Sequence, residues 1–196
     1  MMAAITRESL MSLEQYAAQR NEFRARVIAH KQDREVHLGD HVTLMFEDEL
    51  TMRYQIQEML RAERIFEAQG IAEELEAYNP LVPEGSNWKV TMLIEYTDEG
   101  ERREALARLI GIEDKVWVQV AGEPRVYAIA DEDLERETAE KTSAVHFLRF
   151  ELGAAMKEAL KRGEPLAMGV DHPRYGVHIE AVSEPVRRSL LSDLMA

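Results

Sequence analysis

Two stretches of alternating residues constrain the fold of this chain more than any other feature. In residues 88–96 every second side chain is apolar or aromatic, so one face of a strand would carry Trp88, Val90, Met92, Ile94 and Tyr96. In residues 144–151 both alternating rows are partly apolar, which is typical of a strand in the interior of a sheet. A period of two does not fit a helix, so the chain is expected to build a sheet around these segments.

The order of the elements favours an α+β fold. A β-α-β-β pattern occurs twice: strand 88–96, helix 99–110, strands 115–120 and 125–130, then strand 144–151, helix 153–162, strands 165–170 and 176–182. Upstream, Ser12 and Gln15 form a capping-box pattern for a helix over 9–29, and Gly39-Asp40 supplies the turn of a hairpin. The recurrence has a simpler alternative, because any α+β chain alternates strands and helices.

We therefore expect a mixed, mostly antiparallel sheet packed with helices, with repeated β-α-β-β units, an N-terminal helix and a hairpin. The length of 196 residues suits a single globular domain over residues 1–196.

Composition excludes several classes of function. The chain has no cysteine, so it has neither disulfides nor an iron–sulfur cluster held on cysteine, and iron, manganese or zinc would have to bind His, Asp and Glu. The net charge is −13 and no basic stripe is visible, which argues against nucleic acids and anionic membranes as partners. No apolar run approaches the length of a membrane span and no signal peptide is visible, so we expect a cytoplasmic protein.

A carboxylate lies on the apolar face of a predicted helix over residues 50–68. At 100° per residue, Glu63 falls in the middle of the face formed by Met52, Ile56, Met59, Leu60 and Phe66. A carboxylate in that position should be desolvated and should need a partner. Glu63 is therefore a candidate metal ligand or acid/base group. The alternatives are a structural ion pair, or a bent helix that lets Glu63 reach water.

The predicted strand 144–151 carries two polar groups in an apolar setting. Arg149 is a candidate ion-pair partner for Glu63 or for Glu151. His146 is a candidate metal ligand beside Glu63, with Glu58 as a third ligand, and the alternative for His146 is a hydrogen-bonded core histidine. The charge run 131–141 is interpreted as a solvated turn or loop.

The common catalytic motifs are absent from the sequence. It has no Glu-x-x-His pattern of di-iron bundles, no His-Glu-x-x-His, no Gly-x-Ser-x-Gly and neither of the glycine-rich nucleotide loops. These absences disfavour the common nucleotide-binding enzymes and serine hydrolases, and leave open whether the chain is an enzyme at all.

Five stretches resemble a bacterial family of unknown function, number 3501 in the domain-of-unknown-function series. They are residues 22–31, 46–51, 54–61, 78–87 and 141–150, and the resemblance runs from about Leu10 to Leu191. The resemblance implies no catalytic or binding residues. Genes of the family often neighbour those of a rubrerythrin-like di-iron protein and an iron–sulfur oxidoreductase, which implies a role beside a peroxide-handling redox system under oxidative stress, with one of these as partner.

Two functional hypotheses follow. The first is a non-enzymatic accessory or interaction protein of a peroxide and iron redox system. The second is a small metal-dependent enzyme or metal-binding protein that uses Glu63, His146 and Glu58. A homodimer is expected only because two-fold dimers are the commonest assemblies of such proteins.

Overall fold

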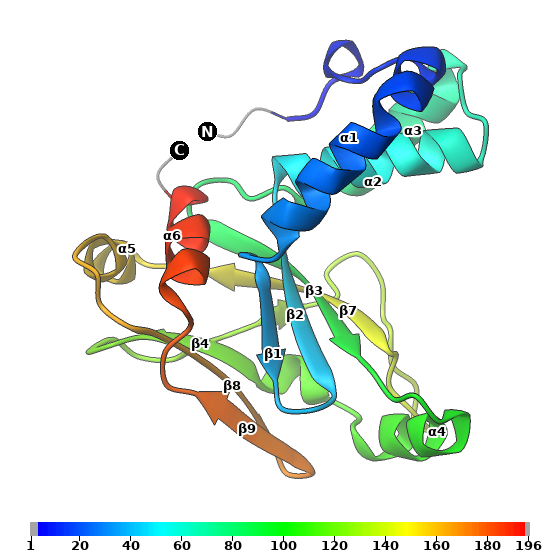
Figure 1. The fold of residues 1–196 in the computed structure, drawn as a ribbon. Coiled ribbons are helices and arrows are strands. Elements are labelled where there is room, and N and C mark those ends of the chain that lie inside the picture. Colours follow the sequence, from blue (N-terminus) through cyan, green and yellow to red (C-terminus); the bar gives the residue numbers. More distant parts are fainter. Residues whose placement is uncertain (1–3, 195–196) are drawn as a thin grey trace.

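Two antiparallel sheets, a projection of three helices and three further helices make up the fold in the computed structural model, which describes residues 4–194 (Figure 1). The first sheet has the strand order β1 (Glu35–Leu38), β2 (Val42–Glu47), β3 (Asn87–Ile94), β7 (Val145–Glu151) and β6 (Ile129–Ala130). The second has the order β5 (Val126–Tyr127), β4 (Val116–Val120), β8 (Leu166–His172) and β9 (Tyr175–Ile179). The α+β class is thus confirmed, with two sheets in place of the single expected one.

The β-α-β-β pattern occurs twice, as the sequence predicts. The first unit runs through β3, α4 (Glu99–Arg108), the short η3 (Ile112–Lys115), β4 and β5; the second runs through β7, α5 (Ala154–Lys161), β8 and β9. Strands β3 and β7 pair with each other in one sheet, and β4 and β8 pair in the other. Equivalent strands therefore lie side by side at the centre of each sheet. The C-terminal helix α6 (Glu184–Ser192) follows the second unit.

The main core lies between the two sheets. The face of β3 predicted from the alternation is buried there, with Trp88, Val90, Met92 and Ile94 at most 3% exposed. Side chains of β4 and β8 cover it from the other sheet, and α5 and α6 contribute Leu160 and Leu190. The opposite face of β3, which carries Lys89, is only partly buried.

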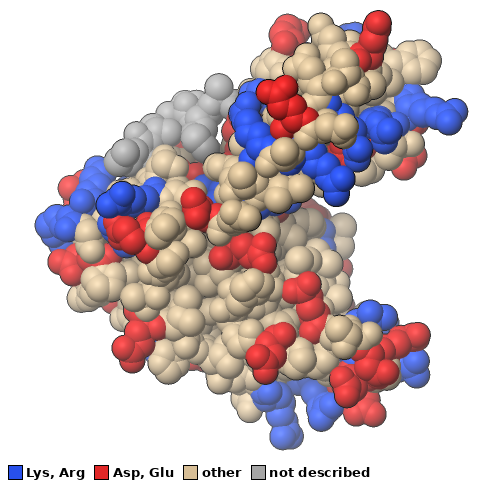
Figure 2. Space-filling view, viewed as in Figure 1, with Lys and Arg blue, Asp and Glu red and all other residues tan. Residues whose placement is uncertain are grey.

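The helical projection consists of α1 (Leu13–Lys31), α2 (Glu49–Ala62) and α3 (Ala68–Tyr78), with short turns η1 (Arg7–Ser9) and η2 (Asn79–Leu81). Ser12 caps α1 through the predicted capping box with Gln15. Two small apolar clusters, separate from the core between the sheets, hold these helices together. Figure 2 shows that the molecule is hollowed below the projection.

Helix α2 is shorter than the sequence predicts. It ends at Ala62, and Arg64 adopts the left-handed conformation with φ 54°. The amide N–H of Ile65 donates to the carbonyl of Leu60, which is the hydrogen bond of a Schellman ending. The left-handed position of such an ending is usually a glycine. Because this chain has an arginine there, the sequence does not indicate where the helix ends.

Within residues 4–194, no helix combines the length and the apolar character needed to cross a membrane.

Candidate functional site

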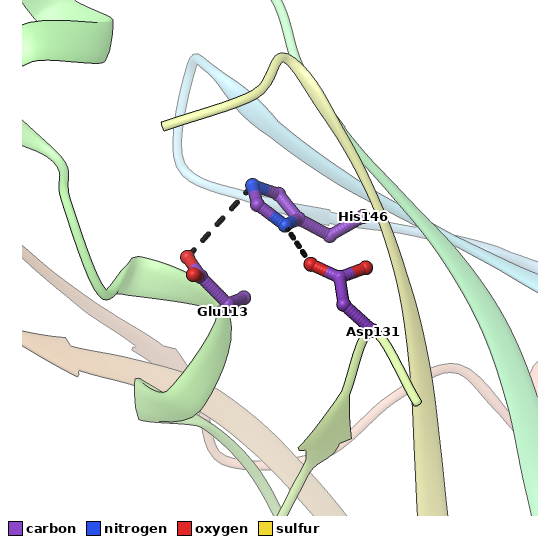
Figure 3. Close-up of side chains that lie close together, drawn as sticks. All are labelled: Glu113, Asp131 and His146. Carbon is purple, nitrogen blue, oxygen red and sulfur yellow. Dashed lines mark hydrogen bonds and ion pairs between the residues drawn. The ribbon is translucent and has the colours of Figure 1, made fainter. Parts of the chain in front are cut away.

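Three ionisable side chains from separate elements meet beside the first sheet (Figure 3). Glu113 comes from η3, Asp131 directly follows β6, and His146 is the second residue of β7. Each offers one ligand-type atom, and these atoms lie within 4.8 Å of one another. No other group of three such residues occurs in the part of the chain that the structure describes.

The ring of His146 is fully buried and uses both nitrogens. Nδ1 lies 2.6 Å from Oδ2 of Asp131. Nε2 lies 2.9 Å from Oγ1 of Thr142, 3.1 Å from the carbonyl oxygen of Ser143 and 3.8 Å from Oε2 of Glu113. Asp131 therefore orients the ring so that Nε2 points at three oxygen atoms.

Asp131 is held in an uncommon backbone conformation. Its φ is 49°, in the left-handed region that only a few per cent of non-glycine residues adopt. Its Oδ1 accepts hydrogen bonds from the amide of Phe147 at 3.0 Å and from Arg136 at 3.1 Å. The guanidinium of Arg136 also lies 4.6 Å above the ring of Phe147. Aspartate adopts this region more readily than most other residues, and these contacts fix the direction of its carboxylate.

Glu113 is a buried carboxylate in an environment short of positive charge. It is 5% exposed, and the hydroxyl of Thr142 donates to it over 3.4 Å. Burial raises the pKa of Glu113, and the adjacent carboxylate of Glu137 raises it further, while His146 lowers it. Ionised Glu113 would therefore be stabilised by a cation at this position.

A cavity of about 390 Å³ adjoins the site. Its charged lining consists of seven carboxylates and one arginine: Glu113, Asp114, Asp131, Glu132, Asp133, Glu135, Glu137 and Arg136. Such a lining attracts cations and repels anionic substrates.

Thr142, His146 and Asp131 would have the order of a nucleophile, a base and an orienting acid if the Thr142 hydroxyl donated to Nε2 instead of to Glu113. Nucleophilic catalysis is nevertheless a poor fit, because the carboxylate of Glu113 lies 3.4 Å from the hydroxyl. A tetrahedral intermediate needs hydrogen-bond donors at its oxyanion, and a carboxylate in that place would oppose it. The arrangement suits a cation better than an oxyanion.

Of the site residues predicted from the sequence, the structure places His146 in this cluster and the others elsewhere. Glu63 is exposed at the end of α2, so its predicted burial is wrong: the helix stops at Ala62, and helical periodicity does not apply beyond that residue. Glu58 accepts hydrogen bonds from Tyr16 and Arg20 and thereby joins α2 to α1. Arg149 pairs with Glu132 and Glu151 rather than with Glu63.

Sequence reasoning missed Glu113 and Asp131. No pattern marks Glu113, which lies in a single turn after α4. Asp131 is the first residue of the charge run interpreted as solvated, and most of that run is indeed exposed. The available signal was the predicted position of His146 in a central strand, since a buried histidine needs polar partners.

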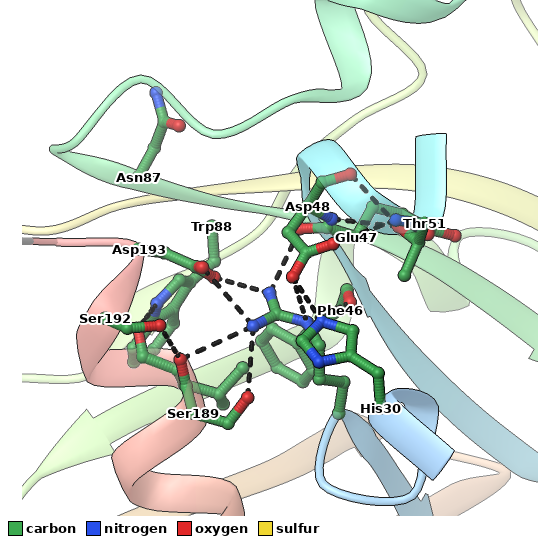
Figure 4. Close-up of polar contacts among 12 residues, drawn as sticks. His30, Phe46, Glu47, Asp48, Thr51, Asn87, Trp88, Ser189, Ser192 and Asp193 are labelled. Carbon is green, nitrogen blue, oxygen red and sulfur yellow. Dashed lines mark hydrogen bonds and ion pairs between the residues drawn. The ribbon is translucent and has the colours of Figure 1, made fainter. Parts of the chain in front are cut away.

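A second buried charge cluster lies where the projection meets the sheets (Figure 4). Arg34 is fully buried and donates to the backbone carbonyls of Phe46 and Glu47. Its guanidinium also pairs with Asp193, next to α6, at 2.5 Å. His30 lies 2.5 Å from Asp48 at the more exposed edge of the cluster. These contacts join the N-terminal third of the chain to its last helix.

The protonation of Asp193 predicts how the stability of the protein depends on pH. Burial raises the pKa of Asp193 from its ordinary value of 3.8 to about 6, although Arg34 opposes the shift. Between these values Asp193 binds more protons in the folded protein than in the unfolded chain, so its contribution to the free energy of unfolding falls as the pH rises and is constant above about pH 6. When wild type and Asp193→Asn are compared by urea unfolding, the difference between their free energies of unfolding should fall by this contribution, on the order of 2 kcal/mol, as the pH rises to about 6. Identical pH profiles would contradict the assignment.

Comparison with known proteins gives a close structural relative but no activity. A crystal structure at 1.90 Å of a novel protein of unknown function from Burkholderia pseudomallei K96243 is 59% identical to the chain, with a TM-score of 0.93. The match covers 98% of this chain and 100% of that one. No curated protein matches the sequence significantly.

A family model described as "Protein of unknown function (DUF3501)" matches residues 4–194. This match includes every element of both sheets and of the projection. The chain therefore belongs to the DUF3501 family.

Proposed function

We propose that the protein binds a divalent transition-metal ion, of the class of iron, manganese or zinc, through His146 and Glu113. The observation that carries the proposal is the convergence of three oxygen atoms, each from a different residue, around Nε2 of the buried histidine. Imidazole and carboxylate are the ligands that such metals take in a chain without cysteine.

The spacing of these atoms fits one ion. Metal–ligand bonds of about 2.0–2.2 Å place neighbouring ligand atoms roughly 3.0–3.5 Å apart. From Nε2 of His146, the oxygens of Thr142, Ser143 and Glu113 lie at 2.9, 3.1 and 3.8 Å. Oγ1 of Thr142 lies 3.4 Å from Oε2 of Glu113. Shifts of a few tenths of an ångström would be enough for an ion to contact His146 and Glu113 together.

Asp131 has the position of a supporting group rather than a ligand. Its carboxylate is hydrogen-bonded to Nδ1 of His146, so the metal would bind the other ring nitrogen, Nε2. Known metal sites have the same carboxylate–histidine–metal arrangement. Its other oxygen is already bound by Phe147 and Arg136. The acidic cavity beside the site provides an entry path that favours cations.

The accessory role in a peroxide and iron redox system is supported by the family resemblance alone. A metal site without thiolates is compatible with that role, because it requires no iron–sulfur cluster. A rubrerythrin-like or iron–sulfur oxidoreductase partner, and a homodimer, stay predictions.

Elemental analysis of untagged protein, purified without chelator, tests the metal site. We expect about one iron, manganese or zinc ion per chain, or stoichiometric uptake of one of them by the empty protein. His146→Gln and Glu113→Gln should each weaken binding by about 100-fold or more, because even the groups that orient a ligand contribute 10- to 100-fold.

His172→Gln is the matched control. His172 is also buried on a strand, and its Nε2 lies 3.1 Å from the carbonyl oxygen of Ile110. This variant should bind metal like the wild type. A folded wild-type protein that takes up none of the three metals, or a folded His146→Gln protein with full occupancy, would contradict the proposal.

A further inference from the structure

A second cavity, of about 590 Å³, lies between the helical projection and the outer face of the first sheet. Its apolar walls include Tyr78 and Leu81, from the end of α3 and from η2, and Phe147 of β7. Both the size and the apolar character are those of pockets for small organic molecules.

Most charges that line this cavity are already paired. Glu132 binds Arg149 through both carboxylate oxygens, each at 2.9 Å. Asp133 binds Arg136 through both oxygens, at 2.6 and 2.7 Å. Two of the acidic groups in the lining are therefore neutralised by arginine.

Lys89 differs from these residues. Its side chain is only 13% exposed, and its ammonium lies 3.7 Å from the nearest carboxylate, Glu84, which is itself 69% exposed. This separation exceeds a hydrogen bond. No hydrogen bond of the ammonium is present within residues 4–194, although the group has three donors. An ammonium held only by this long ion pair has donors free for an anion that enters the cavity.

The neighbours of Lys89 across the sheet strengthen this conclusion. On one side it lies directly opposite Arg149 of β7, whose guanidinium is occupied by Glu132 and Glu151. On the other side it lies opposite Glu47, whose two carboxylate oxygens accept hydrogen bonds from Thr91 and Thr51. Of the two cations in the lining, Arg149 is hydrogen-bonded to two carboxylates, whereas Lys89 makes only the long ion pair with Glu84.

We propose that this cavity binds a small organic acid with an aromatic or otherwise apolar body and one carboxylate. Lys89 receives the carboxylate, and the apolar body lies between Tyr78 and Phe147. The cavity shares Glu132 and Asp133 with the lining of the candidate metal site, so the ligand would lie beside the entrance to that site. The proposal does not depend on a bound metal.

Calorimetric titration of the full-length protein with naphthoate and with uncharged naphthamide, both in the presence of a chelator, tests this site. We expect saturable binding of one naphthoate per chain. Lys89→Met keeps the apolar stem and removes the charge, so it should weaken naphthoate about tenfold or more and leave naphthamide nearly unchanged. Ala77→Trp, at an exposed position of the lining, should block both ligands by filling the cavity.

Lys161→Met serves as the control, because Lys161 is an exposed residue of α5 outside this cavity. It should bind both probes like the wild type. The absence of saturable naphthoate binding to folded wild-type protein would overturn the proposal, as would a Lys89→Met or Ala77→Trp protein that binds naphthoate with wild-type affinity.

Discussion

Replacing Arg34 by methionine is expected to lower the free energy of unfolding by about 3–5 kcal/mol. The side chain is fully buried, and its loss would leave the carboxylate of Asp193 and the carbonyls of Phe46 and Glu47 without their donor. A buried charge whose partner has been removed is far more costly than a lost surface contact. Urea unfolding followed by circular dichroism measures the change.

Two further variants test whether the loss of stability comes from the buried pair of Arg34 and Asp193 or from the loss of any arginine. Arg188→Met removes a side chain that is 75% exposed on α6 and should change stability by less than about 0.5 kcal/mol. Adding Asp193→Leu to Arg34→Met removes the stranded carboxylate and should restore part of the loss. If Arg34→Met is as stable as Arg188→Met, the buried pair does not hold α6 in place.

Substitution of Gly169 by valine is expected to cost about 2–3 kcal/mol, because the site has no room for a side chain. A Cβ atom there would lie 2.5 Å from Cζ2 of Trp117 and 2.8 Å from Cβ of His178. Trp117 is Gly169's partner across the sheet, and its ring is fixed by Asp171, which accepts from Nε1 at 3.0 Å, and by Arg125 stacked above it. The ring therefore cannot move aside cheaply. Thermal or urea unfolding measures the loss.

The matched control is Gly176→Val on the next strand, where the nearest atom to an added Cβ is 3.9 Å away. This substitution should be nearly neutral. Trp117→Leu combined with Gly169→Val should show a favourable coupling, since the smaller side chain frees the space. Equal costs for the two valine substitutions would show that contact with the ring of Trp117 is not what limits position 169.

Local patterns predicted most of the fold. The capping box at Ser12, the turn at Gly39-Asp40 and the alternation around Trp88 each depend on residues close in sequence, and the structure contains all three elements. The end of α2 could not be predicted, because Arg64 takes a conformation that usually marks glycine. The division into two sheets also lies outside such patterns, since alternation shows which face is buried and not which strands pair.

The candidate site was only partly predictable for the same reason. His146 was noticeable because it is a polar residue in an apolar strand. Its partners Glu113 and Asp131 come from two other segments, and both stand among many other acidic residues. Glu63 shows the opposite error: a regular pattern gave it a buried position that the true helix boundary removes.

The contacts between Arg34 and α6 have a consequence for how the protein is made. Arg34 and Asp193 are 159 positions apart, and Trp88 donates to the carbonyl of Leu190, 102 positions later. The ribosome synthesises a chain from its N-terminus, so Arg34 and Trp88 leave the ribosome long before Asp193 and Leu190 have been made. During translation the part of the first sheet on which α6 packs stays exposed until α6 has been made, and transiently exposed apolar surface is prone to aggregation. Protein that is cut short before α6 should therefore depend on chaperones or be degraded.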